Sequence, residues 1–337
     1  MKIARSLIIN LAMQETTLMK KKLFFPLVIL ILVAVAVFYV ARKKSASNPQ
    51  SQTISISGAF ALYPMAIKWA EEFRKIHPEV RIDVSAGGAG KGMTDALSKV
   101  VDIGMVSREI YEAEIAKGAW WVPVAKDAVI PTINTNNPHV EAILKRGLSP
   151  DQAKAIWIAG TMKTWGDFLG TSASEPINSY TRSDSCGAAE TWAKYFGKKQ
   201  EDLRGTGVFG DPGIAEAVRQ DKLGIGYNNV AFAYDAATKK VLPPLQILPI
   251  DLNANGQIDP EELFYENRDQ LIAAIMAGKY PSPPARDLHF VTFGAPEKPI
   301  LREFFRWVLT EGQKFTDGEG YIKIPEEKKK SALNQLK

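Results

Sequence analysis

The sequence predicts an α/β fold, and two features of its hydrophobic pattern carry the prediction. Short runs in which apolar and polar residues alternate, as in strands, precede longer runs with apolar residues three or four positions apart, as in amphipathic helices. This order repeats along the chain, with glycine-rich turns between several of the runs. Such repetition indicates largely parallel sheets with crossover helices, in which ligands bind where strand ends meet helix starts.

The alternation is clearest in the first elements after residue 53. In chain order we expect a strand at 54–57, a turn at 58–61, a helix at 62–76, a strand at 80–84, a glycine-rich turn at 87–92, a helix at 93–100 and a strand at 101–105. The first helix ends before Pro78, because proline cannot continue a helix.

The basic charge of the chain is concentrated at its start. The formal net charge of the 337 residues is +5, but residues 1–52 hold eight Lys and Arg against one acid. The remainder holds 34 basic and 36 acidic side chains, which is not the composition of a nucleic-acid-binding surface. We therefore expect no nucleic-acid partner. The single Cys excludes an internal disulfide and a cysteine-based zinc site.

The run from Leu23 to Ala41 is almost entirely apolar, and basic residues flank it on both sides. Its length suffices for a helix that crosses a bilayer. A cleaved secretory signal begins in the same way, but no small-x-small cleavage site follows the run closely. We favour an uncleaved transmembrane helix at 23–41, a cytoplasmic segment at 1–22 and a linker at 42–52. The rest of the chain would then be extracytoplasmic and anchored to the membrane.

The stretch from Ile177 to Phe196 has the pattern of an anion site. A strand-like run leads to Arg182, small residues follow, and a helix with Ala189 and Trp192 on one face comes next. The free N–H groups at a helix start favour an anion, and an arginine adds a permanent charge with forked donors. The alternative is an ordinary strand, turn and helix with a surface arginine.

Further motifs follow in a fixed order along the chain. In chain order they are Thr164-Trp165-Gly166-Asp167, the stretch from Arg182 to Ala188, Gly224-Ile225-Gly226-Tyr227, Glu311-Gly312-Gln313-Lys314 and Gly320-Tyr321. Together they resemble the phosphate-binding proteins of ABC importers, which are periplasmic binding proteins. The likeness runs in collinear order from about residue 53 to residue 325.

The resemblance implies a two-lobe fold of type II. Each lobe would be a mixed, mostly parallel sheet with flanking helices, and the chain would cross twice between the lobes. Lobe 1 would comprise residues 53–132 and 288–337, and lobe 2 would comprise residues 133–287.

The resemblance also implies four places that meet the ligand: the first turn, the glycine-rich turn, the end of the third strand and the helix start after the arginine. The residues at these places are Ala59, Phe60, Ala61, Ala89, Ser107, Arg108, Arg182, Ser185, Cys186, Gly187 and Ala188. We expect Asp184 to pair with Arg182 and orient it, while Glu109 is the acid next to the third place.

The chain departs from the family at these places. Positions where the family has Ser or Thr hydroxyls hold Phe60, Ala61, Ala89, Cys186 and Ala188. Where phosphate binders often have an Asp that accepts the proton of hydrogen phosphate, this chain has Ser107. Each missing hydroxyl would cost about 1.5–3 kcal/mol, whereas backbone N–H donors do not depend on the side chain. We expect an oxyanion ligand: phosphate by resemblance, with sulfate, molybdate or tungstate as alternatives.

Residues 251–262 match the calcium-binding loop of an EF-hand. The predicted ligands are the side chains of Asp251, Asn253, Asn255, Asp259 and Glu262 and the backbone carbonyl of Gln257. A polar surface turn is the alternative. We expect one structural Ca²⁺ here, without a second EF-hand.

The leading functional hypothesis is a monomeric, membrane-tethered solute-binding protein that delivers an oxyanion to an ABC permease. A tethered sensor or scaffold without a role in transport is the alternative. An enzyme is not expected. The three His are scattered at positions 77, 139 and 289, and no arginine follows Cys186 in the short loop that a cysteine phosphatase requires.

Overall fold

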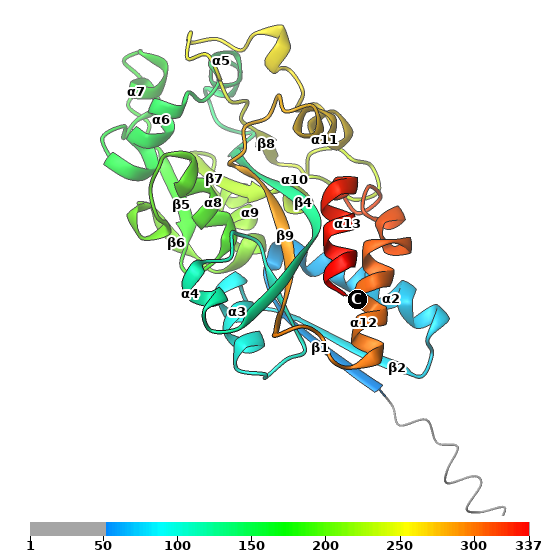
Figure 1. Cartoon of the computed structure of the whole chain (residues 1–337). Coiled ribbons are helices and arrows are strands. Elements are labelled where there is room, and N and C mark those ends of the chain that lie inside the picture. Colours follow the sequence, from blue (N-terminus) through cyan, green and yellow to red (C-terminus); the bar gives the residue numbers. More distant parts are fainter. Residues whose placement is uncertain (1–51, 337) are drawn as a thin grey trace, which may run out of the picture. The chain divides into compact units, whose positions relative to one another are not determined.

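The computed structural model describes residues 52–336. The predicted anchor at 23–41, the segment 1–22 and residues 42–51 of the predicted linker 42–52 lie outside the described residues, whereas Gln52 already belongs to the first strand. From Thr53 onward the chain forms one compact unit, shown in Figure 1. No helix within residues 52–336 is both long enough and apolar enough to cross a membrane.

Strands and helices alternate along the described residues. The strands are β1 (Gln52–Gly58), β2 (Val80–Ala86), β3 (Ile103–Val106), β4 (Ala119–Asn134), β5 (Asn178–Arg182), β6 (Thr206–Val208), β7 (Gly224–Asn229), β8 (Leu245–Ile247) and β9 (Ala285–Phe293). The α-helices are α2 (Tyr63–Ile76), α3 (Ala89–Leu97), α4 (Glu112–Ile115), α5 (Val140–Arg146), α6 (Pro150–Lys154), α7 (Trp165–Leu169), α8 (Gly187–Tyr195), α9 (Gly210–Gln220), α10 (Val230–Ala233), α11 (Arg268–Met276), α12 (Pro299–Leu309) and α13 (Glu326–Gln335). Short turns of other helix types are η1 (Phe60–Leu62), η2 (Ala155–Ala159), η3 (Gln200–Asp202), η4 (Pro260–Glu262) and η5 (Glu311–Phe315).

The strands pair in the order β2-β1-β3-β9-β4-β7-β5-β6, and β8 also pairs with β4. Outer pairs such as β1–β3, β5–β6 and β5–β7 are parallel. The pairs that involve β4 or β9 are antiparallel, so the expectation of mostly parallel lobes holds for the outer strands only. Figure 1 shows β4 and β9 side by side through the middle of the molecule. The register of β4 against β9 shows that the chain runs one way along β4 and returns along β9.

Three hydrophobic cores lie along these two strands. The first contains residues between 54 and 125 and between 288 and 336, and the second contains residues between 129 and 248. The third lies beside the second and includes Ala128, Ile130 and the aromatic rings of Tyr265 and Tyr280. We call the part around the first core lobe 1 and the part around the other two lobe 2. Strand β4 passes from the first core to the second between Ala125 and Val129.

Close backbone approach fixes the turns of lobe 1. A Cβ atom on Gly92 would lie 2.4 Å from the Met105 carbonyl oxygen and 2.8 Å from the Gly58 Cα, so only glycine fits there. Gly88, with a φ of 92°, precedes α3, which begins at Ala89 and not at the expected residue 93. The earlier start brings the N-terminus of α3 beside the ends of β1 and β3.

Candidate functional site

The three predicted turns of lobe 1 converge at one place. The Gly87 and Gly88 N–H groups donate to the Gly58 carbonyl at 2.9 and 3.0 Å, and the Ala59 N–H donates to the Met105 carbonyl at 2.9 Å. These bonds join the turn after β1 to the starts of α3 and to the end of β3. Residues at the carboxyl ends of neighbouring strands therefore form one edge, as expected for ligand sites in α/β sheets.

The fourth predicted place, the start of α8 in lobe 2, packs directly against this edge. A Cβ atom on Gly187 would lie 2.1 Å from the Ser107 carbonyl oxygen and 2.3 Å from its Oγ. The Gly90 N–H donates to the Ser185 carbonyl at 3.3 Å. All four places that the sequence singles out thus meet across the two lobes.

The predicted residues without side-chain donors stand at the starts of helical turns. Phe60 and Ala61 begin η1, Ala89 begins α3, and Gly187 and Ala188 begin α8. The first N–H groups of a helix have no intrahelical acceptor, and the positive end of the helix dipole lies beside them. Three helical starts therefore lie along the edge where the two lobes meet.

Cys186 caps α8. Its Sγ accepts a hydrogen bond from the Ala189 N–H at 3.3 Å, and its own N–H donates to the Gln200 Oε1 at 3.0 Å. Burial raises the pKa of the Cys186 thiol to about 12, even though Arg182 opposes this effect. The thiol is therefore neutral at physiological pH and is not an activated nucleophile.

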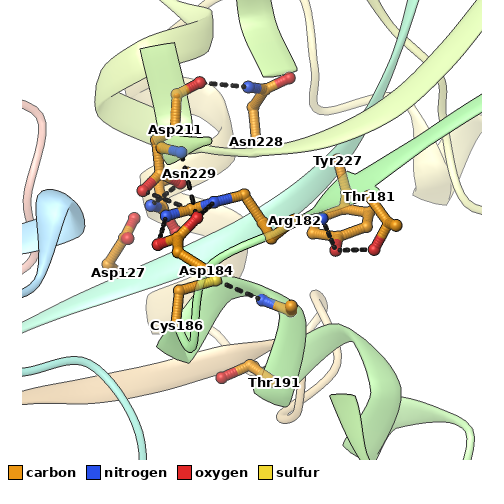
Figure 2. A network of polar contacts seen from close by, with 12 residues as sticks. Asp127, Thr181, Arg182, Asp184, Cys186, Thr191, Asp211, Tyr227, Asn228 and Asn229 are labelled. Atoms are coloured by element: carbon orange, nitrogen blue, oxygen red, sulfur yellow. Dashed lines mark hydrogen bonds and ion pairs between the residues drawn. The ribbon is translucent and has the colours of Figure 1, made fainter. Parts of the chain in front are cut away.

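Arg182 lies in a buried ion-pair cluster (Figure 2). Its Nε and Nη2 donate to the two carboxylate oxygens of Asp184 at 2.8 and 2.6 Å, and its Nη1 lies 2.8 Å from the Asp211 Oδ2. Only 1% of the Arg182 side chain is exposed. The prediction that Asp184 orients Arg182 is confirmed, whereas Asp211 is a partner that sequence reasoning missed.

The ring of Phe60 covers the same guanidinium. The ring centre lies 5.6 Å from the Arg182 Cζ and 5.7 Å from the centre of the Phe209 ring, which it meets edge to face. Phe60 belongs to lobe 1, whereas Arg182 and Phe209 belong to lobe 2. An aromatic face attracts a cation, so this contact holds the two lobes together beside the candidate site.

The cluster continues from Arg182 to the central strands. Asp211 accepts a hydrogen bond from the Asn229 side chain, which in turn accepts one from Arg286 on β9. The Arg286 guanidinium also lies 3.4 Å from the Asp127 carboxylate on β4. The sequence did not point to Asp127, Asn229 or Arg286 as members of a polar cluster. The one hint was the pair Asn228-Asn229, because two amides at the end of an apolar strand need buried hydrogen-bond partners.

Three carboxylates face two guanidinium groups in this cluster: Asp127, Asp184 and Asp211 against Arg182 and Arg286. Burial raises the pKa of Asp127 to about 6, although Arg286 lowers it. Burial by itself would lower the pKa of Arg182, but Asp211 and the other nearby acids raise it above the usual value. Arg182 is therefore permanently charged, and its charge is balanced within the protein.

Arg108 and Glu109, the other charged groups near Ser107, have partners away from the convergence. The Arg108 guanidinium donates to both carboxylate oxygens of Glu114 at 2.9 and 2.7 Å and stacks on the Tyr111 ring at 4.3 Å. The Glu109 carboxylate pairs with Lys194 of lobe 2 at 2.5 Å. In this arrangement neither side chain is available beside Ser107, which is itself buried.

The predicted calcium loop is ordered by its own side chains. The Asp251 carboxylate accepts hydrogen bonds from the Gly256 and Asn255 N–H groups at 2.9 and 3.2 Å, and Glu262 accepts from Leu252 and Asp259 at 2.7 and 3.0 Å. Gly256 has a φ of 84°, which explains the glycine at the sharp turn. Among the described residues, no three His, Cys, Asp or Glu side chains are gathered as around a metal ion. Calcium binding by this loop stays a prediction.

Comparison with known proteins places these features in a family. Residues 43–311 match the model of the PBP superfamily domain. The phosphate-binding protein PstS of Pseudomonas aeruginosa is 25% identical over 314 residues, covering 85% of this chain and 87% of the relative. PstS of Methanocaldococcus jannaschii is 26% identical over 349 residues, covering 86% and 87%.

Solved structures agree at the level of the fold. A putative phosphate ABC transporter substrate-binding protein with bound phosphate from Clostridium perfringens has a TM-score of 0.66 at 23% identity, over 81% of this chain and 100% of that chain. An ABC-type phosphate transport receptor from Vibrio cholerae has a TM-score of 0.58 at 19% identity, over 81% and 100%. The chain resembles the phosphate-binding proteins of ABC importers along most of its length, and it belongs to the PBP superfamily.

Proposed function

We propose that this protein is the solute-binding component of an ABC importer and that it binds an inorganic oxyanion, phosphate in the first instance, between its two lobes. One observation carries the proposal. The starts of η1, α3 and α8 come from both lobes and lie where the lobes meet, beside the permanently charged Arg182.

Backbone donors would do most of the binding. An oxyanion accepts several hydrogen bonds at once, and helix starts present N–H groups without intrahelical acceptors. These donors remain when the side chain is Ala or Gly, so Ala61, Ala89 and Ala188 do not abolish the site. Arg182 would contribute through the N–H groups that its carboxylate partners leave free, since a guanidinium has five.

Ser107 would determine how well the site distinguishes protonated from fully ionised anions. A serine hydroxyl both donates and accepts hydrogen bonds, whereas an aspartate at this place would accept only. The Glu109 carboxylate is held by Lys194 and does not substitute for the missing acid. We therefore expect weaker discrimination between hydrogen phosphate and fully ionised anions such as sulfate, molybdate and tungstate. Another oxyanion is for this reason the second candidate ligand.

Transport would depend on closure of the lobes. A ligand that contacts both lobes favours the closed state in proportion to its differential affinity for that state. Contacts such as Phe60 with Arg182 and Glu109 with Lys194 already join the lobes and would contribute to the same state. We propose that the closed form delivers the anion to a permease, that the protein acts as a monomer on the extracytoplasmic side, and that the helix at 23–41 tethers it.

The test is titration calorimetry of the full-length chain with phosphate, sulfate, molybdate and tungstate at two pH values. We expect phosphate to bind in the micromolar range or more tightly. Ser107→Ala should weaken binding by about tenfold or more, because a hydrogen bond to a charged ligand contributes about 1.5–3 kcal/mol. Ser172→Ala, in an exposed loop, is the matched control and should bind as the native chain does.

Arg182→Met should abolish binding, and circular dichroism must first show that the variant folds. If another of the four anions binds tightly and phosphate does not, that anion is the ligand, and the protein is still the solute-binding component of an importer. If none of the four binds to the folded chain, the oxyanion site is refuted. The remaining reading would then be a tethered sensor or scaffold.

We also propose that the loop 251–262 binds one Ca²⁺ as a structural clip. The support is the match of its ligand positions to the EF-hand pattern together with the buried carboxylates of Asp251 and Glu262.

A further inference from the structure

A cavity of about 640 Å³ lies beside the central strands, and neither Ser107 nor Gly187 is among the residues that line it. Lobe 1 contributes the segment 108–111, lobe 2 contributes one side of α8, and β4, β9 and α13 complete the wall. Its volume falls within the range of pockets that hold organic ligands and is much larger than an inorganic oxyanion needs. We call it the hinge cavity.

Basic side chains outnumber acidic ones among the residues that line the hinge cavity, although one of the acids, Glu190, has no cationic partner within residues 52–336. Arg108, Lys126, Lys194, Arg286 and Lys328 line it together with three acids, Glu109, Glu190 and Asp287. Four of the five basic side chains have carboxylate partners. Lys126 is the exception, because it forms no ion pair within residues 52–336. It lies opposite Asp287 in the sheet, but that carboxylate pairs with Lys328.

Arg286 is the most buried of these cations, since only 6% of its side chain is exposed. Its Nε is buried and has no hydrogen-bond partner among the described residues. Its Nη1 donates to the Thr191 hydroxyl at 3.2 Å, and its distance of 3.4 Å from Asp127 is long for a charge-assisted hydrogen bond. Both Lys126 and Arg286 therefore retain donors for an anionic group.

The same cavity wall also carries apolar side chains. Ile110, Trp121 and Pro283 line the cavity and are partly exposed, so they offer an apolar surface to a ligand. A ligand that fits this wall has an anionic group for Lys126 and Arg286 and a flat or apolar body for Trp121. Inorganic phosphate has only the first of these features.

We propose that the hinge cavity is a second binding site, which takes a small organic carboxylate or phosphate ester with an aromatic or apolar body. Its walls come from both lobes, and two interlobe contacts belong to it: the Tyr111 hydroxyl donates to Glu190 at 2.6 Å, and Lys194 pairs with Glu109 at 2.5 Å. A ligand that contacts both walls favours the arrangement in which they meet.

The hinge cavity and the oxyanion site share a hydrogen-bonded chain. Arg286 donates to Asn229, Asn229 donates to Asp211, and Asp211 pairs with Arg182. Occupancy of the cavity should therefore raise the affinity for the oxyanion, and coupling of binding sites is reciprocal. This coupling rests on the proposed function, whereas binding to the cavity does not.

The test uses 4-fluorobenzoate and 4-fluorophenyl phosphate as probes, observed by fluorine NMR with the purified full-length chain. We expect at least one probe to bind and to stay bound when inorganic phosphate is saturating. Lys126→Glu should weaken binding of the probe at least tenfold, because it reverses the charge inside the cavity. Lys198→Glu makes the same charge change at an exposed site and should have no effect.

Arg286→Met should also lose the probe, and Lys126→Glu keeps the inference testable if that variant fails to fold. The inference is overturned if neither probe binds, or if inorganic phosphate displaces the probe and Lys126→Glu binds it as the native chain does. A bound probe should raise the phosphate affinity at least fivefold, and an unchanged affinity would overturn the coupling. If the chain binds the probe but no inorganic anion, the second site stands and the proposed function fails.

Discussion

At the scale of single residues, small side chains allow the two lobes to approach closely at the candidate site. Gly187 touches Ser107 so closely that one added carbon atom would lie 2.1 Å from a carbonyl oxygen. At this one contact the α8 backbone lies directly against Ser107, and no side chain of Gly187 separates them.

Gly187→Ala should keep the lobes apart. Alanine is a better helix former than glycine by about 1 kcal/mol, so α8 itself gains stability, but the new Cβ collides with Ser107. We expect the phosphate affinity in calorimetry to fall at least tenfold while the melting temperature stays within a few degrees. Gly318→Ala, whose Cβ would make an ordinary 3.6 Å contact, is the control. Unchanged affinity in Gly187→Ala would mean that binding does not require this contact.

Cys186 should be inert. At a pKa of about 12, roughly one thiol in ten thousand is ionised at pH 8, and the side chain is buried. We expect no reaction with a thiol reagent in the folded chain at pH 8 and one equivalent after denaturation. Cys186→Ser keeps a good helix cap and should bind phosphate as the native chain does. Rapid labelling of the native protein would contradict this assignment and revive a catalytic role.

At the scale of elements, β4 and β9 join the lobes and also carry buried charge. Asp127 and Arg286 face each other in the register of the two strands, and Asn229 at the end of β7 bonds to Arg286. Buried ion pairs contribute little net stability when complete, but removal of one partner is costly. This cluster therefore fixes how the two strands and α9 meet beside the candidate site.

Asp127 predicts a pH dependence of stability. Its pKa rises from 3.8 to about 6 in the folded protein, so folding favours the protonated form. The contribution of this group to the free energy of unfolding is unaffected below pH 4. It falls as the pH rises from 4 to 6 and stays lower above pH 6, by about 3 kcal/mol at most.

The measurement is urea unfolding at pH 4.5 and pH 7.5. Asp127→Asn should lose this part of the pH dependence, because the amide does not ionise, while Asp83→Asn on the exposed side of β2 should keep it. The same difference between the two pH values in Asp127→Asn and in the native chain would show that Asp127 titrates normally.

At the scale of the whole molecule, the two lobes meet at the proposed anion site and at the larger hinge cavity. The predicted calcium loop lies between β8 and α11, and the helical turn η4 closes it. Its carboxylates bind backbone N–H groups of the loop, which leaves the loop ordered in advance. A metal there would stabilise lobe 2 without touching the anion.

Calcium should raise the melting temperature of the full-length chain by several degrees. A site with a dissociation constant near 10⁻⁴ M adds about 2.7 kcal/mol at 10 mM Ca²⁺. Glu262→Gln should abolish the shift, Glu261→Gln is the control, and Mg²⁺ should act more weakly. If the native chain has the same melting temperature in Ca²⁺ as in EDTA, the loop is a polar surface turn and not a calcium site.

The sequence by itself predicted the strands and helices between residues 54 and 105, the strand, turn and helix around Arg182, and the pair of Arg182 with Asp184, while the family resemblance pointed to the four turns of the candidate site. These depend on local information: periodicity within an element, glycine at a turn and a partner two residues away. The start of α3 was misplaced by four residues, because its first turn is stabilised by close contact with β1 and β3 and not by an apolar pattern.

Only the tertiary structure decided which groups balance the buried charges. Asp211 lies 29 positions from Arg182 and Asp127 lies 159 positions from Arg286. The packing of α9 against β5 brings the first pair together, and the pairing of β4 with β9 brings the second. Arg108 shows the same at short range, because the fold of the loop before α4 turns it toward Glu114. A buried charge pairs with the group that the folded chain places beside it. The sequence alone does not show which distant residues become neighbours in space.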